Sequence, residues 1–402
     1  MIQALLLDLD DTLLVNNIDR FLPAYLERLG AFLNDLVPAE RFIPLLLQAT
    51  RVMAENDDPE RTLDRVFAAS FYPSLGMTEE SLHPRIEAFY ESEFPRLRSL
   101  TRQIPEAQAL VRQAARRGLE LAVATNPLFP RTAIEQRLEW AGVSPREHDY
   151  GLITSYEVVH FAKPSPAYYA EALALLGRPP AESAMVGDNV DADLVPARLL
   201  GIPVYHAADV PAEGFPGGSL GGVLAWVEEQ IPASALPAAR TPRALSATLR
   251  ANLAALITLV SRLKAEDWCK PLPPNDWSPL ETLCHLRDAE IEVNLPRLET
   301  ILAQPMPFLS AVHTDPWVGE RGYQRQSPSE ALAAFTQARK QLLARLGPLS
   351  QGDWSLPARH SLLGPTTLAE VVGLIADHER IHVASFRRAS ASGLETPSRQ
   401  GI

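Results

Sequence analysis

In the first half of the chain, short apolar runs alternate with segments whose apolar residues recur at helical spacing. The runs predict buried strands, and the helical spacing predicts amphipathic helices between them. Regular alternation of strands and helices is typical of a parallel sheet with helices on both faces, so we expect an α/β core. The strands are expected at 2–7, 119–124, 152–153, 184–186 and 203–205, and the helices at 107–117, 131–141, 166–176, 191–200 and 220–231.

A helical segment of roughly 80 residues interrupts the alternation soon after the first strand. Leu22, Leu26 and Leu29 lie on one helical face, and later apolar residues repeat that spacing. No part of the segment has a strand pattern, so we interpret it as an all-helical insert. The expected boundaries are 1–15 and 99–231 for the α/β core and 16–98 for the insert.

The second half has a different pattern, with four amphipathic helices and no predicted strand. It follows a segment rich in Pro and Ala that is typical of an interdomain linker. Three of the helices begin with a capping box, and four such helices predict a four-helix bundle. The capping pairs are Ser278 with Glu281, Ser327 with Glu330, and Thr367 with Glu370, and the expected ranges are 232–240 for the linker, 241–392 for the bundle and 393–402 for a tail.

Composition narrows the classes of function. A net charge of −12 in 402 residues argues against a general nucleic-acid binder, which normally carries a basic surface. The two cysteines cannot form a disulfide framework. No continuous apolar run is long enough to span a membrane, and the apolar start is too short for a signal peptide. We therefore expect a cytoplasmic protein that binds neither nucleic acid nor membranes.

Polar residues follow the predicted strands of the first half. Asp8 and Asp10 follow the first strand, Thr125 the second and Asp188 the fourth, and Lys163 lies about ten residues beyond the third. Ligands of open α/β sheets bind at the carboxyl ends of the strands, so these side chains are expected to converge. A strand-end threonine or a Lys-Pro pair alone is more often an ordinary residue, and aspartates in such a turn are as often simple turn formers as site residues.

This set of residues is suited to phosphoryl transfer through a covalent intermediate. Asp8 is the candidate nucleophile, and Asp10 is the candidate acid and base for the leaving group and for water. Mg²⁺ prefers carboxylate and carbonyl oxygens, so Asp8, Asp188 and the backbone carbonyl of Asp10 are its expected ligands. Lys163 is expected to neutralise Asp8 and the phosphoryl oxygens, and the Thr125 hydroxyl to bind a phosphoryl oxygen.

The segments that carry these residues resemble the motifs of the haloacid dehalogenase-like hydrolase superfamily. The matching stretches are Asp8-Leu9-Asp10-Asp11-Thr12, Thr125-Asn126, Lys163-Pro164, and Gly187-Asp188 through Asp193. The resemblance covers 1–231. It implies a Rossmann-like core with roles at the site for Asn126 and Asp193, and it implies that the insert is a mobile cap. Dehalogenases of this superfamily generally lack the second aspartate, so Asp10 favours a phosphatase acting on a small phosphorylated substrate, with a phosphomutase as the alternative.

His378 and His382 lie four residues apart on one helical face in the second half. Such a pair can hold a divalent metal, although alone it more often has a structural role. The stretch also matches the H-E-x-x-H motif of zinc proteases. That reading is doubtful because Ser385 and Arg388 stand where the extended motif needs glycine and histidine. His285 on the second bundle helix is the better candidate for a third ligand.

This half resembles the DinB/YfiT-like family of metal-binding four-helix bundles. The resemblance is carried by Trp277-Ser278-Pro279, His285, His378 and His382. It implies a site at which His285, His378 and His382 hold Zn²⁺ or Ni²⁺. Cys284 lies off that helical face, so we expect a buried structural thiol.

Three hypotheses follow for the whole chain. The first is a Mg²⁺-dependent phosphatase with an additional metal-binding bundle of unknown role. The second places the main activity in the bundle, as a metal-dependent hydrolase or thiol transferase. In the third the bundle is non-enzymatic and serves either for oligomerisation, for example as a homodimer, or for binding a partner. The cap decides the substrate, which the core motifs do not reveal.

Overall fold

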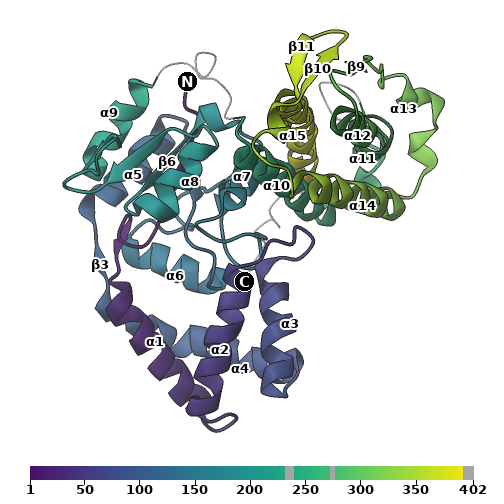
Figure 1. The fold of residues 1–402 in the computed structure, drawn as a ribbon. Coiled ribbons are helices and arrows are strands. Elements are labelled where there is room, and N and C mark those ends of the chain that lie inside the picture. The colour runs from purple at the N-terminus through teal and green to yellow at the C-terminus, as the bar shows by residue number, and fades with distance from the viewer. Residues whose placement is uncertain (231–239, 272–276, 393–402) are drawn as a thin grey trace. The chain divides into compact units, whose positions relative to one another are not determined.

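The computed structural model describes residues 1–230, 240–271 and 277–392 (Figure 1). The chain divides into two compact units: Met1–Leu173 with Arg178–Ala238, and Ala174–Gly177 with Ala239–Ile402. The expected linker at 232–240, apart from residue 240, and the expected tail at 393–402 lie outside the described residues.

The first unit is built on a parallel sheet with the strand order β5-β4-β1-β6-β7-β8. The first strand lies inside the sheet and is completely buried, which explains its unbroken apolar run. The strands are β1 (Ala4–Leu7), β4 (Glu120–Val123), β5 (Leu152–Ile153), β6 (Ser183–Gly187), β7 (Val204–Ala207) and β8 (Gly217–Gly218). The expectation of an α/β core is confirmed, and β8 is an additional strand that was not among those expected. Its two glycines carry no apolar signal, and only backbone pairing with β7 makes it a strand.

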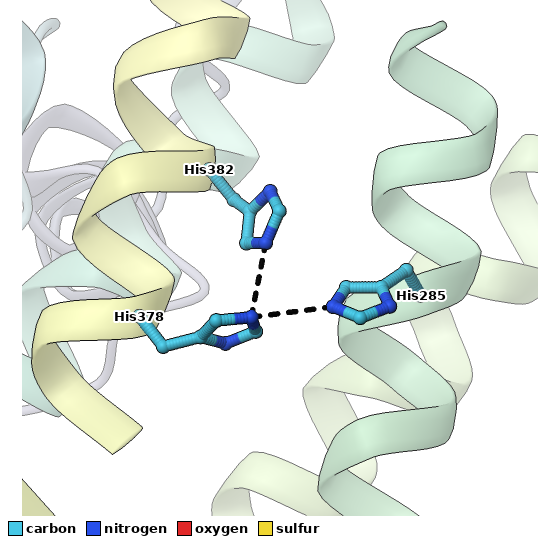
Figure 2. Close-up of side chains that lie close together, drawn as sticks. All are labelled: His285, His378 and His382. Atoms are coloured by element: carbon cyan, nitrogen blue, oxygen red, sulfur yellow. Dashed lines mark hydrogen bonds between the residues drawn. The ribbon is translucent and has the colours of Figure 1, made fainter. Parts of the chain in front are cut away.

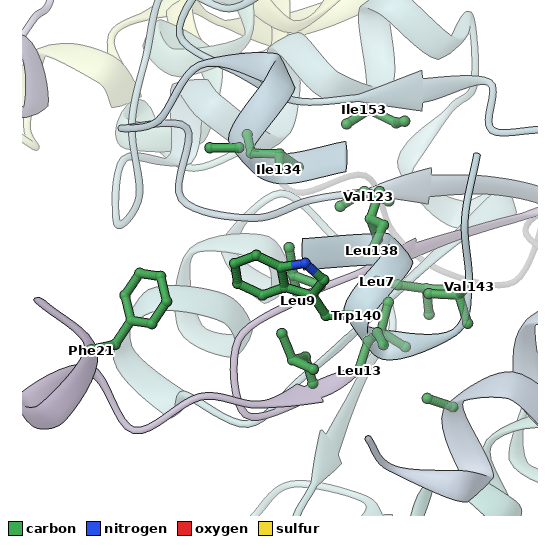
Figure 3. Packing of buried hydrophobic residues seen from close by; sticks show 14 of the residues in the cluster. Leu7, Leu9, Leu13, Phe21, Val123, Ile134, Leu138, Trp140, Val143 and Ile153 are labelled. Carbon is green, nitrogen blue, oxygen red and sulfur yellow. The ribbon is translucent and has the colours of Figure 1, made fainter. Parts of the chain in front are cut away.

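The helices of this unit lie between the strands, as the alternation predicts. They are α5 (Pro105–Arg116), α6 (Arg131–Ala141), α7 (Pro166–Leu176), the short pair η3 (Val190–Leu194) and α8 (Val195–Leu199), and α9 (Val223–Glu228). Gly142 ends α6 with φ of 76°, a left-handed conformation that glycine adopts without steric cost. Figure 3 shows how Ile134 and Leu138 of α6 pack with Leu7 and Val123 of the sheet.

The insert consists of helices, as expected: α1 (Ile18–Leu33), α2 (Ala39–Ala54), α3 (Leu63–Leu75), α4 (Glu79–Ser92) and the 3₁₀ segment η1 (Phe94–Leu100). The chain enters and leaves the insert through two antiparallel strands, β2 (Leu14–Val15) and β3 (Arg102–Gln103). This ribbon was not predicted, because two residues are too few to show an alternating pattern. It brings both ends of the insert to one place beside the sheet.

The second unit is mainly helical. Its long helices are α10 (Pro242–Ser261), α11 (Pro279–Ala289), α14 (Pro328–Leu346) and α15 (Leu368–Ser392). Helix α11 continues through the π-helical turn η7 (Glu290–Asn294) into α12 (Leu295–Ala303). Helix α13 (Trp317–Glu320) is short. Reciprocal capping bonds join Ser278 to Glu281 and Thr367 to Glu370. These bonds fix where α11 and α15 begin.

Two features of this unit differ from the sequence analysis. Three short strands, β9 (Phe308–Leu309), β10 (Pro357–His360) and β11 (Gly364–Thr367), form a small sheet where we predicted none. β9 has only two residues, β10 begins with Pro, and β11 contains both Gly and Pro, so the three strands give little strand signal. In addition, α10 is long and apolar enough by composition to cross a membrane, but 72% of its most apolar window is buried within the structure. Its apolar character is that of a core helix.

Candidate functional site

Lys163, Asp8 and Asp193 form a buried cluster at the carboxyl end of β1. The Lys163 Nζ lies 2.6 Å from Asp8 Oδ1 and 2.5 Å from Asp193 Oδ1. Burial raises the pKa of Asp8, and Lys163 opposes that rise. Burial alone lowers the pKa of Lys163, but the two carboxylates raise it well above its usual value, so the ammonium stays protonated.

Asp188 adds a third carboxylate to this cluster. It follows β6, and its Oδ1 accepts a hydrogen bond of 3.3 Å from the Thr12 hydroxyl. Burial, together with Asp193 and Asp11, raises the pKa of Asp188 to about 6. One ligand oxygen from each of Asp8, Asp188 and Asp193 lies within 4.8 Å of the others. Because one lysine cannot balance three carboxylates, these residues fit a divalent cation that prefers oxygen ligands.

Asp193 accepts hydrogen bonds from several donors that the sequence did not reveal. Besides Lys163, its Oδ1 accepts a bond of 3.2 Å from the Tyr169 hydroxyl, and its Oδ2 accepts one of 3.2 Å from the Asn189 backbone N–H. Both oxygens are therefore engaged by donors of the chain. This geometry makes Asp193 a residue that orients the lysine beside Asp8.

Asp10 is not one of the three clustered carboxylates and has partners of its own. Its Oδ1 accepts a bond of 2.8 Å from Asn16 Nδ2, and its Oδ2 accepts one of 2.6 Å from Arg137 Nη1. Arg137 is 1% exposed, and its guanidinium lies 4.8 Å from the centre of the Phe129 ring. These contacts fix the Asp10 carboxylate. The sequence analysis missed Arg137 and Asn16, although an arginine between the apolar residues of α6 is a recognisable signal.

Thr125 and Asn126 follow β4, beside β1. Thr125 is buried, and its backbone carbonyl accepts bonds from the hydroxyls of Thr154, at 3.1 Å, and Tyr168, at 2.8 Å. These bonds fix the end of the strand. Asn126 and Asp10 both line a cavity of about 690 Å³ that extends between the core and α1–α4 of the insert.

A second cluster lies in the helical unit, where Figure 2 shows three histidine rings turned toward one another. His378 Nε2 lies 3.3 Å from His285 Nε2 and 3.1 Å from His382 Nε2. Three nitrogens bound tetrahedrally to one Zn²⁺, each at about 2.0–2.1 Å, would lie about 3.3–3.4 Å apart, so this set fits such an ion. Burial lowers the pKa of all three rings, to about 4 for His285 and about 2 for His382. They are thus neutral at pH 7, which is the form that binds metals.

The two acids near the histidines, Glu379 and Asp288, accept hydrogen bonds from other side chains. Glu379 turns away from the histidines into the bundle, where its carboxylate accepts bonds of 2.7 and 2.8 Å from Arg339. It is 2% exposed, which argues against a metalloprotease that uses it as a base. Asp288 accepts bonds from Arg287, Arg321 and Tyr323.

Trp277 and Cys284 complete this region. The Trp277 ring is parallel to the His382 ring within 3°, with the centres 5.9 Å apart. Cys284 is buried, and burial raises its thiol pKa to about 11. This agrees with the structural thiol that we expected.

Comparisons with known proteins match each unit to a family. Residues 2–201 match the family model described as haloacid dehalogenase-like hydrolase, and residues 248–385 match the DinB superfamily. A phosphoserine phosphatase of Thermus thermophilus is 36% identical over 141 residues, 35% of this chain and 51% of that protein. The bovine haloacid dehalogenase-like hydrolase domain-containing protein 3 is 41% identical over 102 residues, 25% of this chain and 38% of that protein. The chain thus spans about half or less of these curated relatives.

Among solved structures, the chain is similar to YfiT from Bacillus subtilis. That protein is described as a probable metal-dependent hydrolase with an unusual four-helix bundle topology. The identity is 19% and the TM-score 0.36, over 41% of this chain and 91% of that one.

Proposed function

We propose that this chain, in which residues 2–201 are a haloacid dehalogenase-like hydrolase domain and residues 248–385 a DinB-superfamily domain, is a Mg²⁺-dependent phosphatase. The observation that carries the proposal is the contact of the Lys163 ammonium with the Asp8 carboxylate, next to Asp188 and two residues before Asp10. This arrangement combines a nucleophile, a fixed cation, a cation site and a separate proton carrier.

The proposed reaction assigns one step to each side chain. An Asp8 oxygen attacks phosphorus, and the bond from phosphorus to the ester oxygen breaks. Asp10 must first take up a proton when substrate binds. It gives this proton to the leaving oxygen and regains one from the water that attacks the acyl phosphate, which frees phosphate and regenerates Asp8. Lys163 neutralises charge at Asp8 throughout. A Mg²⁺ ion held by Asp8 and Asp188 would offset the repulsion between carboxylate and phosphate.

The test is phosphate release from a broad panel of phosphomonoesters with Mg²⁺. The panel includes phosphoserine, the substrate named for the curated relative. We expect turnover by the wild type and none by Asp8→Asn, with a folded structure verified by circular dichroism. Asp8→Glu is the matched control, since it keeps the charge but displaces the nucleophile, and we expect it to be inactive too. A panel without turnover refutes the proposal, and transfer between hydroxyls without free phosphate indicates a phosphomutase.

The three histidines support a second candidate, a metal-dependent activity of the bundle, either as a hydrolase or as a thiol transferase. We propose that His285, His378 and His382 hold Zn²⁺ or Ni²⁺, since their Nε2 atoms converge and their rings are neutral. Metal content of the purified full chain tests this independently of activity. We expect one transition metal per chain in the wild type and none in His378→Ala/His382→Ala, whereas equal metal content refutes the site. Light scattering on the full chain tests whether the protein forms a homodimer, as the third hypothesis for the bundle expects.

A further inference from the structure

We infer that the phosphatase acts on monoesters of uncharged, largely apolar alcohols and discriminates against esters that carry a carboxylate. The inference rests on the proposed function and concerns the cavity of about 690 Å³ beside Asp10. That volume is in the middle of the range of about 300–1,000 Å³ for small-molecule sites. It is far larger than a phosphate group requires.

The position of the cavity identifies it as the place for the leaving group. Asp10 and Asn126 line it, whereas Asp8 does not. Asp10 is the proposed donor of a proton to the leaving oxygen, so the alcohol must extend from the carboxylate of Asp10. The phosphoryl group then faces Asp8 and Lys163.

The walls of the cavity are mainly apolar. Most of them come from α1–α3 of the insert, and Phe129 adds a ring from the core. The hydroxyls of Tyr25 and Tyr90 also face this region, but they bond to each other at 2.9 Å. Burial of apolar surface is therefore the main contribution that these walls make to binding. The apolar lining residues of α1–α3 are Ile18, Leu22, Leu26, Leu29, Phe42, Leu46, Leu47, Met53, Phe67 and Ala68.

The charges around the cavity disfavour an anionic alcohol. Among the described residues that line it, none is Lys or Arg, and the one histidine, His83, lies 3.4 Å from the carboxylate of Glu87. The remaining acids are Asp64, Glu79, Glu91 and Glu157. A carboxylate of the substrate would lose water here without gaining a cationic partner, which is costly.

Arg137 does not change this conclusion. Its guanidinium lies behind the Phe129 ring, is 1% exposed and is already paired with Asp10. It cannot contact a substrate carboxylate without leaving Asp10. The cavity thus has room and apolar surface for a sizeable alcohol, but no cation to recognise an acid.

A homologous series of substrates measures the apolar contribution directly. We expect kcat/KM of the full-length protein with Mg²⁺ to rise about fourfold for each methylene from ethyl through butyl to hexyl phosphate, which is the rate equivalent of about 0.8 kcal/mol per buried methylene. Replacing the terminal methyl group of hexyl phosphate by a carboxylate, as in 6-phosphohexanoate, is expected to lower kcat/KM at least tenfold. Phosphoserine should rank with the poor substrates.

Two neighbouring alanines of α3 provide a matched pair of variants. Ala68 lines the cavity and is half-buried, whereas Ala69 is exposed and does not line it. We expect Ala68→Arg to raise the ratio of kcat/KM for 6-phosphohexanoate over hexyl phosphate at least tenfold, because it places a cation at the wall. Ala69→Arg should leave the ratio unchanged, and Ala68→Met controls for side-chain size.

The outcomes separate the inference from the proposed function. Turnover with no increase along the alkyl series, or with 6-phosphohexanoate as good as hexyl phosphate, overturns the inference and leaves the phosphatase intact. No turnover of any ester defeats the proposed function and the inference with it. The alkyl series uses the wild type alone, so a variant that fails to fold does not affect that result.

Discussion

Asp10→Asn is expected to destabilise the protein as well as to inactivate it. The substitution removes the negative charge opposite Arg137, whose guanidinium is 1% exposed. The Nε and Nη2 atoms of Arg137 are buried without a hydrogen-bond partner. The Asp10 carboxylate is therefore the anion that balances the buried charge of the guanidinium. Asparagine can still offer a carbonyl oxygen, but it leaves a buried cation without an anion.

The size of this effect follows from the geometry. Removing one partner of a buried ion pair costs about 3–5 kcal/mol, and the remaining carbonyl acceptor puts this variant near the lower value, about 3 kcal/mol. Arg137→Met should cost less, about 1 kcal/mol, because Asp10 keeps its bond to Asn16 and 31% of its side-chain surface is exposed to water. The double variant lacks both charges, and we expect it to lose about 1 kcal/mol.

Thermal unfolding of the full chain measures these differences. About 3 kcal/mol corresponds to a fall of about 6–12 °C in Tm for a unit of this size, and the double variant should regain most of it. Phosphate release should be about 10²–10⁴-fold lower than in the wild type in both variants that lack Asp10, because Arg137→Met restores stability but not the proposed proton carrier. The reasoning is refuted if Asp10→Asn melts within 2 °C of the wild type, or if the double variant is no more stable than Asp10→Asn.

The remaining predictions concern the helical unit. Glu379→Gln should lower the free energy of unfolding by about 2 kcal/mol, since Arg339 keeps its contact with Glu290, and should leave metal content unchanged; loss of metal without loss of stability would show that Glu379 serves the metal. Iodoacetamide should label the exposed Cys269 in the native protein, and Cys284 only after denaturation; native labelling of both would contradict the burial of Cys284. Removing a metal present at about 100 times its Kd should cost about 2.7 kcal/mol of stability, measured by unfolding with and without a chelator.

The sequence predicts most of the sheet and the residues that gather at its edge. Asp8, Thr125 and Asp188 each follow an apolar run, and β1 lies between β4 and β6, so their strand ends meet at one edge. Lys163 lies about ten residues beyond the end of β5, yet its ammonium contacts Asp8. Local patterns therefore identify most of these residues because strand ends are defined locally and a parallel sheet aligns them.

The sequence does not predict contacts that depend on how elements pack. Arg137 and Asp10 are 127 positions apart, and nothing in the spacing of either residue names the other. The two-residue strands β2, β3 and β8 are fixed by backbone pairing with distant segments rather than by their side chains. The charge balance of the cavity is likewise visible only once α1–α4 are in place.

The H-E-x-x-H stretch of α15 shows why a motif needs its helix geometry. Its two histidines lie four residues apart, on one face, and His378 contacts both His382 and His285. The glutamate follows His378 directly, so it lies about 100° around the helix. On that side Arg339 and Asn252 occupy its carboxylate, and the bundle buries it. The glutamate that would be the catalytic base of a protease is here the anion of a buried ion pair with Arg339. The candidate metal site therefore has only neutral nitrogen ligands.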